Sequence, residues 1–135
     1  MEVYNSKYLH VAFFAGQHLL EATWLSETKM MDTEDCKQEF LNYLDIIRKR
    51  RPSRVVVDSS NMLFTFNPKM QDWINETIHK HIISTGIHKL AFVVSKDFFA
   101  QLSIKQTMDE KEGLKFVTQF FDSKETAKKW VLSAA

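Results

Sequence analysis

The stretch from Arg54 to Pro68, RVVVDSSNMLFTFNP, contains the signals that decide the fold. Val55–Val57 is a run of β-branched residues without polar alternation, which is typical of a parallel strand covered on both faces. The polar residues Asp58 to Asn61 follow at once and predict a loop. Asn67 and Pro68 then suit the N-cap and the first position of a helix. A strand, a loop and a helix in this order indicate a unit of an α/β sheet.

The residues before this stretch predict a β-hairpin and a helix. Tyr8–Phe14 and Leu19–Leu25 alternate in polarity on either side of a short break that contains Gly16. A helix then begins at Asp32 or Thr33 and is ended by Pro52. Its apolar residues recur at helical spacing and define one face: Cys36, Phe40, Tyr43, Leu44 and Ile47.

The residues after this stretch predict further α-β units. The helix that begins at Asn67 has Met70, Ile74, Ile78 and Ile82 on one side, and Gly86 ends it. The elements expected next are a buried strand over 90–94, a helical region over 97–112 closed by Gly113, a strand over 114–121 nearer an edge, and a final helix capped by Asp122 or Ser123. We therefore expect residues 1–135 to form a single α/β domain: an N-terminal β-hairpin, repeated α-β units, and a mostly parallel five-stranded sheet with four helices.

Composition excludes several classes of function. The net charge of +1 favours neither nucleic acid nor a membrane surface as a partner. No apolar stretch approaches the length of about 18–20 residues that a membrane span needs, so no membrane insertion is expected. The N-terminus lacks the pattern of a secretory signal, and a lone Cys36 cannot form an internal disulfide. These features favour a cytoplasmic location.

Motifs for catalysis or metal binding are missing from the sequence. No glycine-rich nucleotide loop is present, so we expect no cofactor. His79 and His81 are two residues apart, whereas a zinc pair on a helix needs i, i+4 spacing, so no metal site is expected and the histidines are placed at the surface or an interface. Ser59 and Ser60 have no histidine placed locally as a base, and Cys36 belongs to an apolar helix face. We expect no catalytic residue and no enzyme activity.

Polar residues follow each predicted parallel strand at its carboxyl end, where ligands and partners of α/β sheets usually bind. These residues are Asp58–Asn61, Ser95–Asp97 and Asp122–Ser123. Each group also suits a turn or a helix cap, so both readings stay open. The basic run Arg48–Arg51, with Arg54 close behind, is likewise either a solvated helix end or a contact for phosphate or an acidic partner.

Several motifs resemble one family of bacterial proteins. They are Trp24, VVVD at 55–58, QDW at 71–73, GIHKLAFVV at 86–94, and FFDS at 120–123 with Ala127 and Trp130. With this strand order, they look like the SpoIIAA-like group of uncharacterised proteins, which is related in fold to STAS domains (anti-sigma factor antagonists) and to CRAL-TRIO lipid-binding domains. The resemblance covers nearly the whole chain and implies a SpoIIAA-like, STAS-like fold.

The STAS side of this resemblance implies a non-catalytic module that binds an unknown regulatory protein partner. Anti-sigma factor antagonists carry a phosphorylated Ser or Thr in an Asp-Ser-Ser-Gly-like motif at the start of a helix. Here Asp58-Ser59-Ser60 stands earlier, at the strand end, and Thr65 is the phosphorylatable residue at the matching place. The candidate partner or phosphate loop therefore consists of Asp58, Ser59, Ser60, Asn61, Thr65 and Asn67.

The CRAL-TRIO side of the resemblance implies an alternative, the binding of an apolar small molecule or lipid. The aromatic residues that either line such a pocket or form an ordinary core are Phe13, Phe14, Phe64, Phe66, Phe98, Phe99, Phe120 and Phe121. A homodimer is a further expectation, because symmetric dimers are the commonest oligomers.

Overall fold

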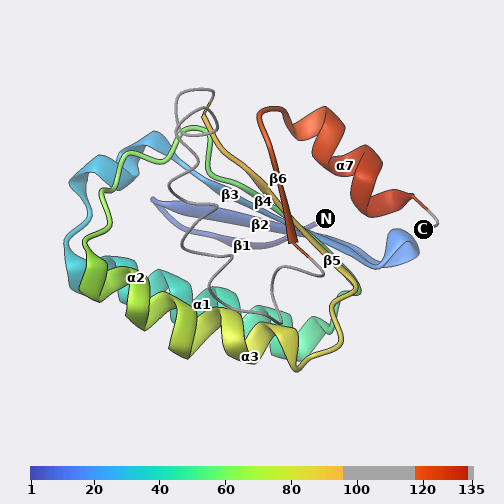
Figure 1. The fold of residues 1–135 in the computed structure, drawn as a ribbon, viewed down its shortest axis with the longest axis horizontal. Coiled ribbons are helices and arrows are strands. Elements are labelled where there is room, and N and C mark those ends of the chain that lie inside the picture. Colours follow the sequence, from blue (N-terminus) through green and yellow to red (C-terminus); the bar gives the residue numbers. More distant parts are fainter. Residues whose placement is uncertain (96–117, 134–135) are drawn as a thin grey trace.

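The computed structural model describes residues 1–95 and 118–133. Within these residues, six strands form one sheet in the order β1-β2-β3-β4-β5-β6 (Figure 1). The strands are β1 (Glu2–Asn5), β2 (Leu9–Phe14), β3 (Leu19–Trp24), β4 (Arg54–Asp58), β5 (Lys89–Val93) and β6 (Thr118–Phe121). The α-helices are α1 (Thr33–Arg50), α2 (Pro68–Ile74), α3 (Lys80–Ile83) and α7 (Lys124–Leu132). A π-helical segment, η3 (Asn75–His79), joins α2 to α3. Two 3-10 turns are formed by Ala15–Gln17 (η1) and Ser26–Met30 (η2).

The sheet is mixed, which confirms the α/β class and the N-terminal hairpin. β1, β2 and β3 pair antiparallel, whereas β3, β4, β5 and β6 pair parallel. In the hairpin Leu9 lies opposite Trp24 and Phe14 lies opposite Leu19. The parallel strands end at the same edge of the sheet, so the segments that follow β3, β4 and β5 meet there.

The expected number of strands, five, is wrong, because β1 was not foreseen. This strand has four residues, its ends are Glu2 and Asn5, and it has no clear alternation of polarity. A register shift between Glu2 and Tyr4 interrupts its pairing with β2. Such a segment is extended because it pairs with the neighbouring strand β2, so its local sequence pattern does not identify it as a strand. The helix predicted over 97–112, with Gly113, and residues 114–117 of the predicted last strand lie outside the described residues.

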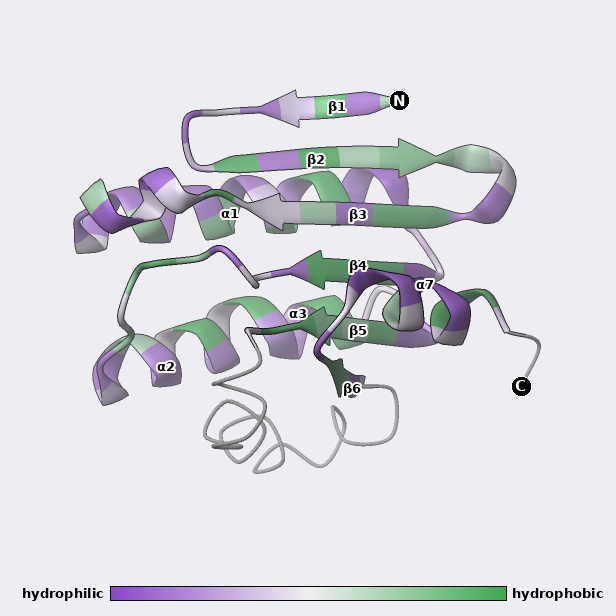
Figure 2. Ribbon diagram, turned by 90° about the horizontal axis from the view of Figure 1, so that it is seen from above, coloured by the Kyte–Doolittle hydropathy of each residue, from purple (hydrophilic) through white to green (hydrophobic). Residues whose placement is uncertain are grey.

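Helices cover both faces of the sheet. The helices α1, α2 and α3 lie on one face, and α7 lies on the other (Figures 1 and 2). Val55 and Val57 belong to the larger core under α1 and α2, whereas Val56 packs in the smaller core with Ala127 of α7. The prediction of a strand covered on both faces is confirmed, since all three valines are buried.

The predicted helix ends are confirmed at three places. Asp32 caps α1 by accepting a hydrogen bond from the Asp35 backbone at 2.7 Å, and Asn67 caps α2 by accepting one from the Met70 backbone at 2.8 Å. Gly86 follows α3 with a φ of 94°, a conformation that a side chain would disfavour. These local signals fix where α1 and α2 begin, and they thereby fix which side chains reach the carboxyl edge of the sheet.

Tyr43 of α1 is 3% exposed, and its hydroxyl has no hydrogen-bond partner in the described part of the chain. Burial raises the pKa of this hydroxyl. Because an unpaired buried hydroxyl is unfavourable, we expect Tyr43→Phe to leave the free energy of unfolding unchanged or to raise it by up to about 1 kcal/mol. Urea denaturation measures this difference.

Tyr4→Phe is the matched control, since the Tyr4 hydroxyl donates to Glu39 and its removal is expected to cost about 1 kcal/mol. A clear loss of stability in Tyr43→Phe would contradict the assignment.

Candidate functional site

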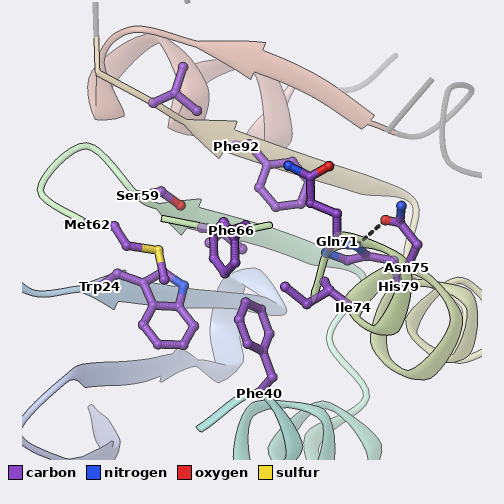
Figure 3. Close-up of a pocket in the computed structure, with 12 residues that line it drawn as sticks. Trp24, Phe40, Ser59, Met62, Phe66, Gln71, Ile74, Asn75, His79 and Phe92 are labelled. Atoms are coloured by element: carbon purple, nitrogen blue, oxygen red, sulfur yellow. Dashed lines mark hydrogen bonds between the residues drawn. The ribbon is translucent and has the colours of Figure 1, made fainter. Parts of the chain in front are cut away.

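A pocket opens at the carboxyl edge of the parallel strands, between the sheet and the helices α1 and α2 (Figure 3). Its volume is about 90 Å³. The strands supply side chains from their last residues, and the loop after β4 closes one side before the chain enters α2. The residues that line it are Trp24, Phe40, Val57, Ser59, Met62, Phe66, Gln71, Ile74, Asn75, His79, Phe92 and Val94.

The walls of the pocket are mainly aromatic. Trp24 at the end of β3 contacts Phe40 of α1, with ring centroids 4.9 Å apart, and Phe40 contacts Phe66 edge-on at 6.2 Å. On the far side, Phe92 of β5 stacks on Phe120 of β6 at 5.5 Å. Trp24, Phe40 and Phe92 are buried, so these rings are held by the core and do not depend on a ligand for their positions. Such a surface suits an apolar group.

One end of the pocket is polar. Asn75 and His79 are 3% and 4% exposed, and Nδ1 of His79 lies 3.3 Å from Oδ1 of Asn75. The His79 ring also meets Phe92 at 87° with a centroid distance of 5.6 Å. Burial lowers the pKa of His79 to about 4, so the imidazole is neutral at neutral pH. With Nδ1–H donating to Oδ1, Nε2 is left as a hydrogen-bond acceptor.

The π-helical segment positions this polar pair. The backbone N–H of Lys80 reaches the carbonyl of Asn75, an i to i+5 bond that widens the helical turn. In this wider turn, side chains four residues apart project in more nearly the same direction than they do in an α-helix. Asn75 and His79 have this spacing. Isolated π-helical turns occur frequently at functional sites. The segment is therefore a structural reason for two polar side chains to face an otherwise apolar pocket.

The placement of His79 corrects one expectation. The histidines were expected at the surface or an interface, but His79 is buried beside Phe92. The spacing of His79 and His81 does not indicate a buried histidine. The i, i+4 spacing of Asn75 and His79 does, because each of them follows an apolar residue of the buried helix face, Ile74 or Ile78. A polar pair at this spacing, adjacent to a buried helix face, indicates a shared polar site.

The predicted loop residues do not converge on one site. Asp58 Oδ1 accepts hydrogen bonds from Ser60, at 3.0 Å from the backbone nitrogen and at 2.6 Å from Oγ, which closes a turn after β4. Asn67 caps α2, and Asn61 and Thr65 are exposed. Ser59 is the member of this set that lines the pocket, and its backbone N–H donates to the Val93 carbonyl at 2.7 Å.

The aromatic residues expected to line a pocket are also placed mostly elsewhere. Of that set only Phe66 lines it among the described residues, while Phe13, Phe14, Phe64, Phe120 and Phe121 do not. Phe98 and Phe99 lie outside the residues that the structure describes. Trp24, Phe40 and Phe92 do line it, and no sequence pattern marked them as pocket residues, because they come from three separate elements.

Two buried carboxylates lie outside the pocket and have structural partners. Glu39 of α1 accepts hydrogen bonds from the hydroxyls of Tyr4 and Ser6, which ties β1 and the following turn to the helix. Burial, together with the charge of Glu39, raises the pKa of the neighbouring Cys36 to about 12. The prediction of Cys36 as a core residue is confirmed, since its side chain is fully buried.

Glu21 of β3 is the second buried carboxylate, and it faces α7. It pairs with Lys124 at 3.0 Å and with Lys128 at 2.9 Å. Burial raises the pKa of Glu21, but the hydrogen bonds from Lys128 and Lys124 outweigh it and hold the pKa below its ordinary value. This cluster therefore fastens α7 to the sheet.

In the described residues, no three His, Cys, Asp or Glu side chains come together as metal ligands. Within the same residues, each helix is too short or too polar to cross a membrane. Comparisons with protein-family models, curated proteins and solved structures found no match for the chain.

Proposed function

We propose that this protein is a non-catalytic binding module that holds a small, largely apolar molecule in the pocket at the carboxyl edge of its sheet. The observation that carries the proposal is a pocket with aromatic walls and one buried polar pair, Asn75 and His79. Apolar walls with a few placed polar groups are characteristic of small-molecule sites. The resemblance to SpoIIAA-like proteins, with CRAL-TRIO domains as relatives in fold, supports the same reading.

The size of the pocket limits its ligand. A volume of about 90 Å³ is smaller than the cavity of roughly 150 Å³ that holds benzene in an engineered protein. It is also well below the several hundred Å³ of a drug-sized site. The enclosed volume therefore takes only part of a ring-sized molecule or a short chain, and the rest of the ligand must extend through the mouth of the pocket. A whole lipid tail is too large.

The geometry favours binding over catalysis. Ser59 and His79 lie on opposite sides of the pocket, with Phe66 drawn between them (Figure 3). A serine nucleophile needs its base within hydrogen-bond reach. His79 instead pairs with Asn75, and its low pKa makes it a poor proton acceptor at neutral pH.

A regulatory protein-binding module, which was the first expectation from the sequence, is the second candidate. Leu63 and Met30 are 54% and 66% exposed, and their segments are joined by a hydrogen bond of 2.8 Å from the Leu63 backbone to Oγ1 of Thr28. Exposed apolar side chains on neighbouring segments suit a protein partner. Thr65 is exposed two residues before the N-cap of α2, where a phosphate would gain from the helix N-terminus.

Toluene is the probe that tests the first candidate. In a Trp73→Phe/Trp130→Phe background, Trp24 is the remaining tryptophan and reports on the pocket wall. We expect a saturable change in its fluorescence with toluene. In Ser59→Leu, whose larger side chain fills the pocket, the change is expected to disappear.

Ser84→Leu is the matched control, because Ser84 is exposed after α3 and does not line the pocket. This variant is expected to bind toluene as the parent does. Circular dichroism confirms that each variant is folded. A response that never saturates, or that persists in Ser59→Leu, would overturn the small-molecule proposal and leave protein binding as the better one.

A further inference from the structure

We infer that the pocket selects neutral molecules in which a ring carries a hydroxyl group, and that the hydroxyl binds between His79 and Asn75. This inference rests on the proposed function and names the class of its ligand. It is carried by the chemistry of the polar end of the pocket, because the apolar walls alone do not distinguish one ring from another.

The described lining of the pocket offers no charge to a ligand. None of the twelve described lining residues is Asp, Glu, Lys or Arg. His79, the one lining histidine, is kept neutral by burial. A carboxylate or an ammonium group entering this pocket would lose its hydration without gaining an opposite charge, which is strongly unfavourable. The ligand is therefore uncharged at the end that enters.

At the polar end, where Gln71 also lines the pocket, the His79–Asn75 pair offers one acceptor, Nε2 of His79, and one donor, Nδ2 of Asn75. Nδ1 of His79 donates to Oδ1 of Asn75, and within residues 1–95 and 118–133 this is the one side-chain hydrogen bond that His79 and Asn75 make. Both side chains line the pocket and are buried, so an apolar ligand would bring no partner to Nε2 of His79 or Nδ2 of Asn75, which have none among the described residues. A hydroxyl donates one hydrogen bond and accepts others, so a single such group satisfies both atoms.

Phenol and toluene separate this inference from the general proposal. The two molecules have the same number of heavy atoms and differ in one group, and phenol is neutral at pH 7. In a pocket that were purely apolar, toluene would bind more tightly, because burying the hydroxyl unpaired is unfavourable. Here we expect phenol to bind about tenfold more tightly than toluene. Benzoate, a charged analogue, is expected not to bind.

The measurement is a titration of ¹⁵N-labelled protein with each of the three compounds, followed by NMR. His79→Phe keeps a ring in place and removes the acceptor. We expect this variant to lose about tenfold in affinity for phenol and to change little for toluene. If His79 had only a structural role, the variant would lose affinity for phenol and for toluene by the same factor. Asn75→Ala, which removes Nδ2, is expected to weaken phenol selectively as well.

The outcomes are distinct. Tighter binding of toluene than of phenol, or equal losses for both in His79→Phe, would overturn the inference while the proposed function stands. Binding of benzoate as tight as that of phenol would overturn the neutral class of ligand. Failure of both toluene and phenol to bind would overturn the proposed function itself, and the inference with it.

Discussion

Acidification from pH 6.5 to pH 4 is expected to lower the free energy of unfolding by about 3 kcal/mol through His79 alone. The folded-state pKa of His79 is about 4, against an ordinary value of 6.5. Between these values the unfolded chain binds a proton that the folded protein does not. Stability is therefore fully present above pH 6.5 and falls as the pH drops toward 4. Well below pH 4 His79 is protonated in both states, so this contribution no longer changes.

The comparison of His79→Gln with the parent isolates this effect. Glutamine retains a partner for Asn75 and does not titrate, so the pH dependence between 6.5 and 4 is expected to be shallower in the variant. The charged neighbours on the same helix, Glu76 and Lys80, pair with each other at 3.8 Å on the exposed side. His81→Gln is the control, because His81 is exposed and its variant should follow the parent curve. Urea denaturation at a series of pH values tests this, and parallel curves for parent and His79→Gln would show that His79 is not held neutral by burial.

Replacing both Lys124 and Lys128 with methionine is expected to lower the free energy of unfolding at pH 7 by about 2–3 kcal/mol. The loss arises because Glu21, whose side chain is 8% exposed, keeps its charge without a partner. A fully enclosed pair would cost more, but the side chains of the two lysines are 42% and 39% exposed, so water screens part of the interaction. Removing the carboxylate as well, in Glu21→Leu/Lys124→Met/Lys128→Met, is expected to restore most of the stability.

The pH dependence gives this second prediction its sign. In the parent the lysines hold the pKa of Glu21 below its ordinary value of 4.5, so their contribution is present above that pH and is lost as the pH falls through the lowered pKa. The difference between the parent and the double lysine variant should therefore shrink in acid. Lys129→Met, which removes an exposed pair with Glu125, is the control and should cost little. A double lysine variant as stable as its parent at pH 7 would contradict a fastening role for Glu21.

Local patterns predicted those parts of the fold that depend on a few neighbouring residues. The caps Asp32 and Asn67 were foreseen because their signals lie within the first turn that they cap. The valine run of β4 was foreseen because burial on both faces leaves no polar alternation. β1 was not foreseen, since its pairing with β2 has a shifted register and its sequence is polar at both ends.

The site was harder to predict for a physical reason. Ser59 and Phe66 were predicted as candidate site residues and do line the pocket. The predicted partner or phosphate loop, however, was centred on the polar end of β4 and the residues that follow it. That end is engaged in its own turn, because Asp58 accepts two hydrogen bonds from Ser60. The aromatic walls come from β3, α1 and β5, which only the tertiary structure brings together. The π-helical turn that aligns Asn75 with His79 has no sequence signature of its own.

The most direct test of the pocket as a ligand site is a crystal structure of the protein with 4-bromophenol. The bromine atom gives an anomalous signal that locates the compound without reference to its shape. We predict one strong peak within the pocket walled by Trp24, Phe40 and Phe92, with the hydroxyl within hydrogen-bond distance of Nε2 of His79. Peaks confined to the surface of the molecule, with the pocket empty, would contradict the proposed function.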